Sequence, residues 1–508
     1  MQNKIDALFQ LWKDHPGAGG QILVMQKGEV LFEKCYGFAN IETQTPMTPD
    51  SMFHMASVTK PFTAMSMLIL HERGLVNVFD DVRKYIPDLI RFPEPLTIKQ
   101  MLNHVSGLQG YYEMMRLGGR SIEDHYAQHE VRRLVARQTR LCSAPGSEFV
   151  YTNANYMLCA TIIERVSGMS FNQFCIENIL RPLGMEKSFI RDDPHVIVPN
   201  KVSSYHDDGY EYTNAILTFG IYGGTSLHST AREIALFMEQ FKNPTLISRK
   251  TMDEIMLNPP LIHGKRGNYG CGVRVDELLG HRYIHHGGVN AGYRTVGQIY
   301  PEDDLIITAC TNTYNIPIET AARDIARIVL GLPERVQKDL SAFEQAEPVL
   351  ENMDGMWYCD RNGNEFNIEI RDGKVYMDGT YMTPVRGSLF KKGRCNIWLN
   401  LGQTVAVAQN GNIMQLRKLS AYSDQSFLEA CAGHYYCPDV QGHYDIFFRD
   451  GGLVMEHIRF GCSPLHYLGE DQFLCRGFDL QFVKDAAGAV TGYKITGERI
   501  DMFFEKVQ

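Results

Sequence analysis

The stretch HMASVTKPFTA at residues 54–64 contains a serine, Ser57, that is followed three residues later by a lysine, Lys60. On a helix, residues three apart lie on the same face, one turn from each other. A serine is a weak nucleophile until its proton is removed, and a lysine accepts that proton only if burial favours its neutral form. The apolar residues around the pair, and the apolar run at 65–70, predict such burial near the start of a helix.

The same spacing occurs a second time, from Ser388 to Lys391. A match of this kind is expected by chance in a chain of this length and composition. The second copy lies in a polar stretch flanked by glycine, with no apolar helix behind it. We therefore take Ser57 and Lys60 as the candidate catalytic pair.

Tyr151, Thr152 and Asn153 form a second candidate element. A tyrosine held near the lysine can exchange protons with the serine and with a leaving group, and the asparagine can hydrogen-bond the lysine or a substrate amide. The same three residue types recur at 212–214 in a polar loop. Tyr151, in contrast, follows a Pro-Gly turn and precedes an apolar helical pattern, so we predict that the earlier copy contributes to catalysis.

A third candidate element is the run of His286, Gly287 and Gly288. Small residues in an edge strand let the backbone approach a bound acyl group and direct an N–H at an oxyanion. His285 with Gly287 has the same H-x-G form, and a K-x-G match occurs at 265–267. The K-x-G match precedes the strand-like residues 269–275 and is predicted to be only a hairpin turn.

Together these motifs resemble the serine β-lactamases and penicillin-recognising hydrolases, in the class C-like branch that holds D-aminopeptidases, D,D-carboxypeptidases and carboxylesterases. LNHVSGL at 102–108, PLGM at 182–185, and GG at 223–224 before STARE at 229–233 extend the match to about residues 1–332. The resemblance implies that Ser57 is the nucleophile, that Lys60 and Tyr151 manage its proton, and that Asn153 anchors the substrate or the lysine.

The resemblance also selects one of the two histidines. In this family a glycine lies six residues after the first letter of the third motif, and Gly292 therefore selects His286. The oxyanion hole would be the backbone N–H groups of Ser57 and Val289, the latter following Gly288. Class C β-lactamases have lysine where this chain has His286, and histidine is mostly neutral at pH 7. This difference favours the peptidase or esterase branch.

Composition favours a large cytoplasmic enzyme. A chain of 508 residues is long enough for two or three domains. The net charge of −9 with scattered basic residues argues against nucleic acid or an anionic membrane as a partner. Residues 1–9 predict an amphipathic helix rather than a secretory signal, and no apolar run is long enough to span a bilayer.

Twelve cysteines without a C-x-x-C pair indicate reduced thiols. No metal and no cofactor is expected, and the expected partner is a small peptide, amide or ester substrate. A homodimer is compatible with the sequence.

The chain repeats itself in its last third. The segment from Leu350 aligns without a gap on the segment from Leu428, 78 residues later, with ten identical positions. Both copies contain an Arg-Asp-Gly turn between alternating apolar residues, which is typical of a β-hairpin. About 78 residues per copy allow roughly eight short strands. We therefore predict two small barrels that arose by duplication.

The predicted fold is an α/β domain of the β-lactamase type, with an antiparallel sheet, flanking helices and an all-α subdomain, followed by two small antiparallel β-barrels. The predicted boundaries are 1–332 for the hydrolase domain, 333–349 for a linker, 350–425 for the first barrel and 426–508 for the second. This arrangement resembles the three-domain D-aminopeptidases, in which an acidic residue on a long loop of the last barrel binds the free amine of the substrate.

The matching stretch here, residues 473–480, is short. Asp479 would pair with an ammonium group, whereas Arg476 would pair with a carboxylate. The predicted function is D-aminopeptidase-like hydrolysis through a Ser57 acyl-enzyme. A D,D-carboxypeptidase, a carboxylesterase or transacylase with the same residues, and a catalytically idle ligand-binding protein remain open.

Overall fold

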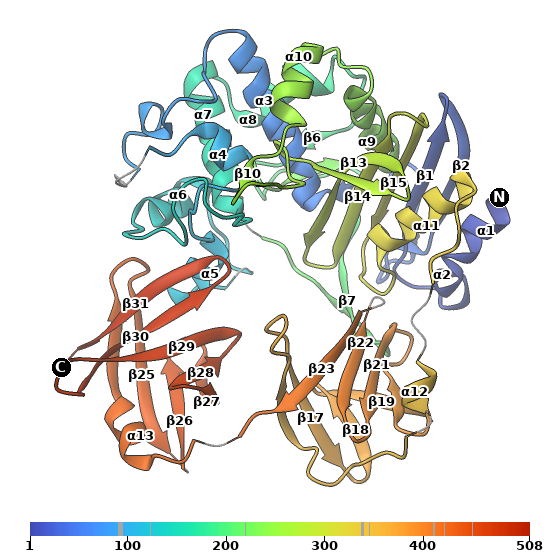
Figure 1. Ribbon diagram of the computed structural model, residues 1–508. Helices are drawn as coiled ribbons and strands as arrows, with labels where there is room; N and C mark the ends of the chain where they lie inside the picture. Colours follow the sequence, from blue (N-terminus) through green and yellow to red (C-terminus); the bar gives the residue numbers. More distant parts are fainter. Residues whose placement is uncertain are drawn as a thin grey trace. The chain divides into compact units, whose positions relative to one another are not determined.

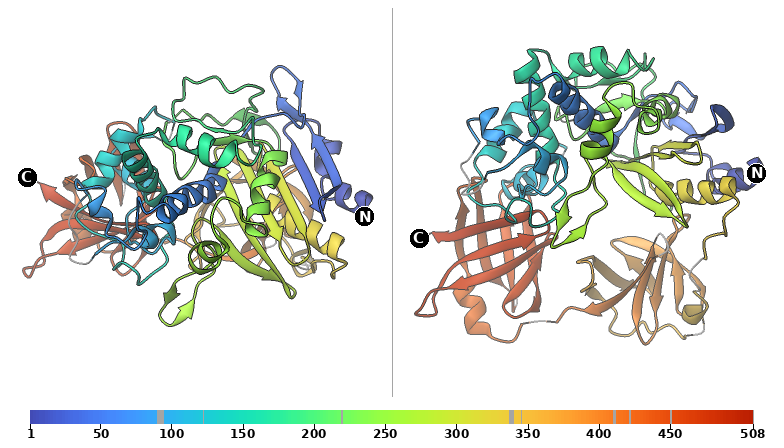
Figure 2. Two further views of the ribbon diagram at one scale, coloured as in Figure 1. Left: turned by 90° about the horizontal axis from the view of Figure 1, so that it is seen from above. Right: turned by 45° about the horizontal axis from the view of Figure 1, so that its top comes forward.

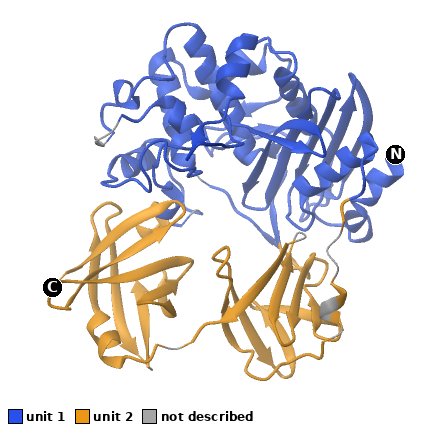
Figure 3. Ribbon diagram, in the orientation of Figure 1, with its two compact units in different colours: residues 1–113, 121–206, 213–334 blue, residues 114–120, 207–212, 335–508 orange. Residues whose placement is uncertain are grey.

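The computed structural model describes residues 1–89, 95–121, 123–218, 220–336, 340–344, 346–409, 412–420, 422–449 and 451–507. They form two compact units (Figure 3): residues 1–113, 121–206 and 213–334 make up unit 1, and residues 114–120, 207–212 and 335–508 make up unit 2. Part of the predicted linker, at 337–339 and 345, lies outside the described residues, as does Asp450 of the second repeat. The predicted domain boundaries stay a prediction.

Unit 1 is built on a six-stranded antiparallel sheet, which confirms the predicted β-lactamase-like layout (Figure 1). Gly20 lies opposite Thr311, so the first and last long strands of the domain pair in the middle of the sheet. In sheet order the strands are β12 (Arg274–Leu278), β13 (His281–Asn290), β14 (Tyr293–Tyr300), β15 (Leu305–Thr311), β1 (Gly20–Gln26) and β2 (Glu29–Tyr36).

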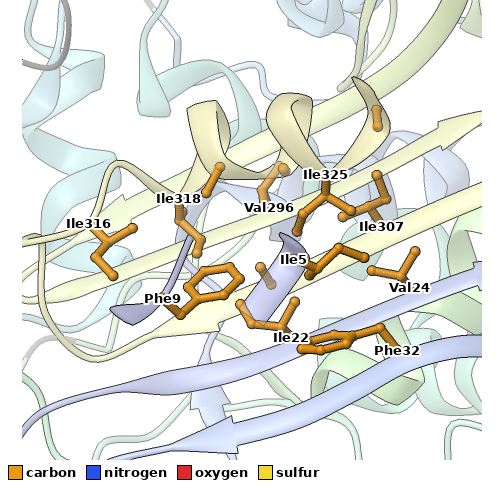
Figure 4. Close-up of a cluster of buried hydrophobic side chains, with 14 of the residues drawn as sticks. Ile5, Phe9, Ile22, Val24, Phe32, Val296, Ile307, Ile316, Ile318 and Ile325 are labelled. Carbon is orange, nitrogen blue, oxygen red and sulfur yellow. The ribbon is translucent and has the colours of Figure 1, made fainter. Parts of the chain in front are cut away.

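One face of this sheet is covered by α1 (Gln2–Ala7), α2 (Gln10–Asp14) and α11 (Ile318–Leu330). Figure 4 shows Ile5 and Phe9 of the N-terminal segment packed with Ile325 of α11 over apolar side chains of the sheet. These apolar residues recur at helical spacing, so burying them holds both ends of the domain together. Gly331, in the left-handed conformation at φ 68°, ends α11.

The opposite face carries α9 (Ala231–Met238), which packs on β14 and β15. Beside it lies the predicted all-α subdomain, in which α3 packs against α7 (Figure 2). Its helices are α3 (Thr59–Glu72), α4 (Ile98–Leu102), α5 (Tyr111–Leu117), α6 (Gln128–Ala136), α7 (Asn153–Ser167) and α8 (Phe171–Cys175), followed by the π-helical segment η3 (Ile176–Leu180). No helix among the described residues is long and apolar enough to cross a membrane.

Short strands follow the helices in the last part of this subdomain. The strand β9 (Leu227–Ser229) pairs with β5 (Phe53–His54) and with β6 (Phe189–Ile190), and β7 (Tyr205–Asp207) pairs with β8 (Tyr212–Asn214). The K-x-G match forms the hairpin of β10 (Leu261–Ile262) and β11 (Lys265–Arg266), as expected. The strand predicted at 269–275 begins only at Arg274, because residues 270–273 turn first.

Unit 2 contains two closed antiparallel barrels of eight strands each, as the doubled pattern predicts. Their first strands start at Gly355 and Gly433, the aligned glycines of the two repeats, and both have positive φ. The first barrel runs from β16 (Gly355–Tyr358) through β17 (Glu365–Arg371), β18 (Lys374–Met377), β19 (Thr380–Arg386), β20 (Leu389–Lys391), β21 (Ile397–Leu401) and β22 (Val405–Gln409) to β23 (Asn412–Lys418).

The second barrel repeats this meander with longer strands. It comprises β24 (Gly433–Cys437), β25 (Gly442–Arg449), β26 (Gly452–His457), β27 (Gly461–Gly469), β28 (Gln472–Cys475), β29 (Phe478–Lys484), β30 (Val490–Gly497) and β31 (Ile500–Val507). Short helices precede the two barrels, α12 (Ser341–Glu344) before the first and α13 (Gln425–Cys431) before the second.

Candidate active site

Ser57 lies in the turn η1 (Ala56–Val58), directly before α3. Ala56 has a φ of 49°, in the left-handed region that costs an alanine about 1–2 kcal/mol. Backbone hydrogen bonds hold the turn: the Met55 N–H donates to Leu227 O at 2.7 Å, and the Ala56 N–H donates to His54 Nδ1 at 3.1 Å. The surrounding packing therefore maintains a strained backbone at the position of the candidate nucleophile.

Lys60 is fully buried in the first turn of α3 and faces Ser57. Its Nζ atom donates hydrogen bonds to Ser57 Oγ at 3.0 Å, to Asn153 Oδ1 at 2.6 Å and to Gly224 O at 2.9 Å. The same atom lies 4.8 Å from the centre of the Tyr151 ring. The first and second sequence motifs therefore meet at one lysine.

The pair of glycines at 223–224 makes this close packing possible. Gly223 has a φ of 90°, and a Cβ there would lie 2.3 Å from the carbonyl oxygen of Tyr156. The carbonyl oxygen of Gly223 accepts a hydrogen bond from Thr63, one turn after Lys60 on α3. Both carbonyls of the glycine pair are thus bound to α3, and the glycines have a structural reason to be there.

Tyr151 and Asn153 are placed by the start of α7. Thr152 is the N-cap of this helix, and its Oγ1 accepts from the Ala154 N–H at 3.3 Å. Asn153 is therefore the first helical residue and turns its amide oxygen to Lys60, while Tyr151 lies just outside the helix.

His104 is a residue that reasoning from the motifs did not single out as part of the site. It is completely buried, and its ring packs against that of Tyr151 with centres 4.2 Å apart. Its Nδ1 accepts from the Thr152 N–H at 3.2 Å, and its carbonyl accepts from Val150 at 2.8 Å. His104 thus positions the segment that carries Tyr151. The sequence signal that could have identified His104 was its position within LNHVSGL, a stretch that resembles the family.

The second copies of the two motifs lie elsewhere. Tyr212 belongs to unit 2, where the Arg394 guanidinium lies 4.2 Å from the centre of its ring. Ser388 is buried in the turn directly before β20 in the first barrel, and its Oγ accepts from the Asn400 side-chain amide. Lys391 is the last residue of β20, so this second pair lies in a turn and a strand and not on one helical face.

The two adjacent histidines of β13 point to opposite faces of the sheet. His285 hydrogen-bonds Asp276 on β12 through Nε2 at 2.8 Å. His286 is buried on the other face, with its ring centre 6.4 Å from that of Tyr151. The structure thus brings His286, and not His285, to the cluster around Lys60.

Both ring nitrogens of His286 are occupied by protein groups. Its Nδ1 lies 2.6 Å from Gly287 O, which can only accept, so Nδ1 carries the proton. Its Nε2 therefore accepts from the Tyr269 hydroxyl at 2.9 Å. Burial first, and the charge of Lys60 second, hold the pKa of His286 well below its usual range. The imidazole is neutral, as the sequence predicts.

Gly288 lets β13 approach the turn that carries Ser57. A Cβ at this position would lie 2.5 Å from Met55 O and 3.1 Å from the Ala56 side chain. Thr295 on β14 reinforces the contact by donating from Oγ1 to Met55 O at 2.8 Å. Val289, the next residue, has a side chain that is 61% exposed, and its predicted oxyanion role stays a prediction.

Arg476 and Asp479 belong to unit 2, where Arg476 lies in the turn between β28 and β29 and Asp479 is the second residue of β29. The Arg476 guanidinium lies 4.0 Å from the centre of the Phe460 ring, and the Arg476 carbonyl accepts from Arg116 at 2.6 Å. Asp479 is half-buried, and burial raises the pKa of its carboxyl group. The predicted contact of these two residues with a substrate stays a prediction.

The described residues contain no group of three or more His, Cys, Asp or Glu side chains that could hold a metal ion. The chemistry of this cluster is that of a serine next to a buried lysine and a tyrosine.

A sequence model of the Beta-lactamase family matches residues 5–331. The chain belongs to this family. Penicillin-binding protein 4* of Bacillus subtilis is 27% identical over 315 residues, which cover 58% of this chain and 69% of that protein. A D-aminopeptidase of Brucella anthropi is 24% identical over 512 residues, which cover 95% of this chain and 94% of that protein. The similarity to the aminopeptidase therefore includes both barrels.

Solved structures show the same fold. The octameric penicillin-binding protein homologue from Pyrococcus abyssi matches with a TM-score of 0.59 and 20% identity, over 91% of this chain and 99% of that chain. Family membership and the aminopeptidase and penicillin-binding relatives show that the protein is a serine hydrolase.

Proposed function

We propose that the protein is a D-stereospecific aminopeptidase or amidase that works through an acyl-enzyme on Ser57. The observation that carries this proposal is the 3.0 Å hydrogen bond between Lys60 Nζ and Ser57 Oγ inside the protein. The Lys60 Nζ atom also lies 4.8 Å from the centre of the Tyr151 ring, so Ser57, Lys60 and Tyr151 are close enough to relay protons.

In the first half of the reaction, Ser57 Oγ attacks the substrate carbonyl carbon while its proton passes to the Lys60 and Tyr151 pair. The backbone N–H groups of Ser57 and Val289 stabilise the oxyanion that forms. Collapse of this intermediate breaks the C–N bond, and the same pair returns the proton to the leaving amine. Water then attacks the ester in the reverse sequence and releases the acid.

The neutral imidazole of His286 supports an open-chain amide substrate over a β-lactam. Class C β-lactamases have a lysine at this position, whose fixed charge suits a substrate carboxylate. Here the position carries no charge, and both ring nitrogens are bound by Gly287 and Tyr269. The match to a D-aminopeptidase across the hydrolase domain and both barrels supports action at a free amino terminus.

A substrate panel tests this proposal. D-alanyl and L-alanyl p-nitroanilides, N-acetyl-D-alanyl-D-alanine, a p-nitrophenyl ester and a chromogenic cephalosporin are compared by kcat/KM, with Ser57→Ala as the control. We expect the D-alanyl anilide to be the preferred substrate. A preference for the acetylated dipeptide would indicate a D,D-carboxypeptidase, and a preference for the ester would indicate a carboxylesterase.

Covalent labelling tests the nucleophile separately from the substrate. We expect a fluorophosphonate to modify Ser57 alone, as located by mass spectrometry of the peptides. Ser388→Ala should leave labelling and turnover unchanged. Modification at Ser388, or full turnover in Ser57→Ala, would contradict the assignment.

A further inference from the structure

A cavity within unit 1 contains side chains that the proposed reaction does not use. Its volume is about 570 Å³. Residues from the end of β5, from the segment before α6, from the segment at 191–204, from the end of β8 and the loop after it, from β9 and from β14 line it. The lining side chains that matter here are His54, Arg191, Lys201, His228 and Tyr293.

The cavity has a positive charge without a matching carboxylate. Arg191 and Lys201 both line it, and no Asp or Glu does so among the described residues. Arg191 donates from Nε to Val196 O at 3.1 Å and from Nη2 to Pro194 O, and its Nη1 group makes no hydrogen bond with the described part of the chain. Lys201 is in no ion pair within that same part.

The two cations are close enough to affect each other. Partial burial, and then the charge of Arg191, lower the pKa of Lys201. The nearby carboxylate of Asp193 is already paired with His195 through Nδ1 at 2.7 Å. Two like charges that share a cavity repel, and a bound anion would remove that repulsion.

The inner wall consists of rings. His54 and His228 meet edge to face with centres 5.2 Å apart, and His54 stacks on Tyr293 at 5.7 Å. Burial holds the pKa of His54 well below its usual range and lowers that of His228 to about 3, so neither ring adds a fixed charge. Rigid walls of this kind position a ligand, while the two cations supply its affinity.

His54 also connects the cavity with the nucleophile turn. Its Nδ1 accepts from the Ala56 N–H at 3.1 Å, so Nε2 carries the proton and donates to Thr225 Oγ1 at 3.3 Å. The Asn290 side chain of β13 donates to the same Thr225 oxygen at 3.3 Å. One wall of the cavity is therefore hydrogen-bonded to both elements that frame Ser57.

We propose that this cavity binds a compact oxyanion, a carboxylate or phosphate-type group, through Lys201 and Arg191. The group is supplied either by a free anion or by an acidic side chain carried on the substrate. Charge-assisted hydrogen bonds to a planar guanidinium and an ammonium are the usual means of recognising such groups.

The test of binding does not depend on turnover. Inorganic phosphate is titrated by calorimetry, at low ionic strength, into the full-length Ser57→Ala protein. We expect saturable binding at one site, about tenfold weaker after Lys201→Gln and lost after Lys201→Glu, because one charge-assisted hydrogen bond is removed or replaced by repulsion. Lys201 is not part of the buried core and is in no ion pair within the described residues, so both variants should melt like the parent protein.

Lys250→Gln is the matched control, because this exposed lysine on α10 (Arg249–Thr251) does not line the cavity. It should leave phosphate binding unchanged. Absence of saturable binding, or equal affinity in the parent and both Lys201 variants, would overturn the proposal.

A kinetic comparison identifies the source of the anion, and this part rests on the proposed function. In the active enzyme, kcat/KM is measured for D-glutamyl and D-glutaminyl p-nitroanilides. If the substrate supplies the carboxylate, Lys201→Gln lowers the ratio of the two values about tenfold. An unchanged ratio together with phosphate binding assigns the site to a free anion.

Discussion

Lys60 Nζ lies 3.0 Å from Ser57 Oγ, and the lysine that makes this contact has no solvent-exposed surface. The same nitrogen reaches Asn153 and the Gly224 carbonyl, so three distant segments converge on one side chain. A single substitution in each segment therefore tests whether that segment contributes to catalysis.

Lys60→Met should remove most of the activity while the fold is kept. Methionine preserves much of the buried volume but cannot transfer a proton, and loss of a proton-transfer group costs about 10²–10⁴-fold in rate. We expect kcat on a D-alanyl anilide to fall in that range and fluorophosphonate labelling to slow. Near-normal turnover in a variant that melts normally would show that Lys60 does not handle the proton.

Tyr151→Phe should lower kcat by a comparable factor, with Tyr212→Phe as the matched control. The ring of Tyr151 lies 4.8 Å from Lys60 Nζ, whereas the Tyr212 ring lies under Arg394 in unit 2. Removal of the hydroxyl keeps the packing of either ring. A larger loss of rate for Tyr212→Phe would contradict the choice of motif.

Gly288→Ala should inactivate the enzyme by moving β13 away from the nucleophile turn. The added Cβ would lie 2.5 Å from the Met55 carbonyl oxygen, which is backbone and cannot rotate aside. Gly267→Ala is the control from the K-x-G match, since its Cβ would meet nothing closer than 3.8 Å. We expect lost turnover and a lower Tm for the first variant and no change for the second.

The stability of the hydrolase domain should fall as the pH drops below about 6.5. Burial lowers the pKa of His286 in the folded protein, so below the usual histidine value of about 6.5 the unfolded chain takes up a proton that the folded domain does not. The contribution of His286 is therefore present above that pH and is lost towards the lowered value, at up to about 1.4 kcal/mol per pH unit.

Melting curves at pH 7.5 and 5.5 measure this effect. His286→Gln should reduce the drop in Tm between the two conditions, because it removes one group that titrates on unfolding. His15→Gln, a change at an exposed histidine, should leave the drop as it is in the parent. An equal drop in all three proteins would argue against a buried neutral His286.

Substitutions of Asp479 and Arg476 are expected to affect different properties, substrate binding for Asp479 and stability for Arg476. Asp479→Ala should lower kcat/KM on a D-alanyl amide if its carboxylate binds the substrate ammonium. Arg476→Ala should instead lower the Tm, because its guanidinium packs on Phe460 within the barrel. If neither variant changes kcat/KM on a free-amine or an acetylated substrate, this turn does not recognise the substrate terminus.

Local patterns in the sequence were sufficient for individual elements and for the doubled barrels, whereas the fold of the hydrolase domain was expected from the resemblance of its motifs to a known family. The spacing of Ser57 and Lys60 places them on one helical face. The repeat that starts at Leu350 and Leu428 contains the alternation and turns from which two barrels follow. These features depend on residues close together in the chain, so the sequence alone is enough to predict them.

Tertiary structure decided the contacts that each of the candidate residues makes. Only the pairing of β13 with β12 and β14 turns His285 towards Asp276 and His286 towards Tyr269. The ring contact between Tyr151 and His104 and the close approach of Gly288 to Met55 each bring together segments that are far apart in the chain. Such contacts depend on how whole elements pack, and no local pattern of residue types encodes that packing. The sequence by itself therefore determined which reactive residue types are present and the helices and strands that carry them. The packing of those elements determined which side chains contact one another in the candidate active site.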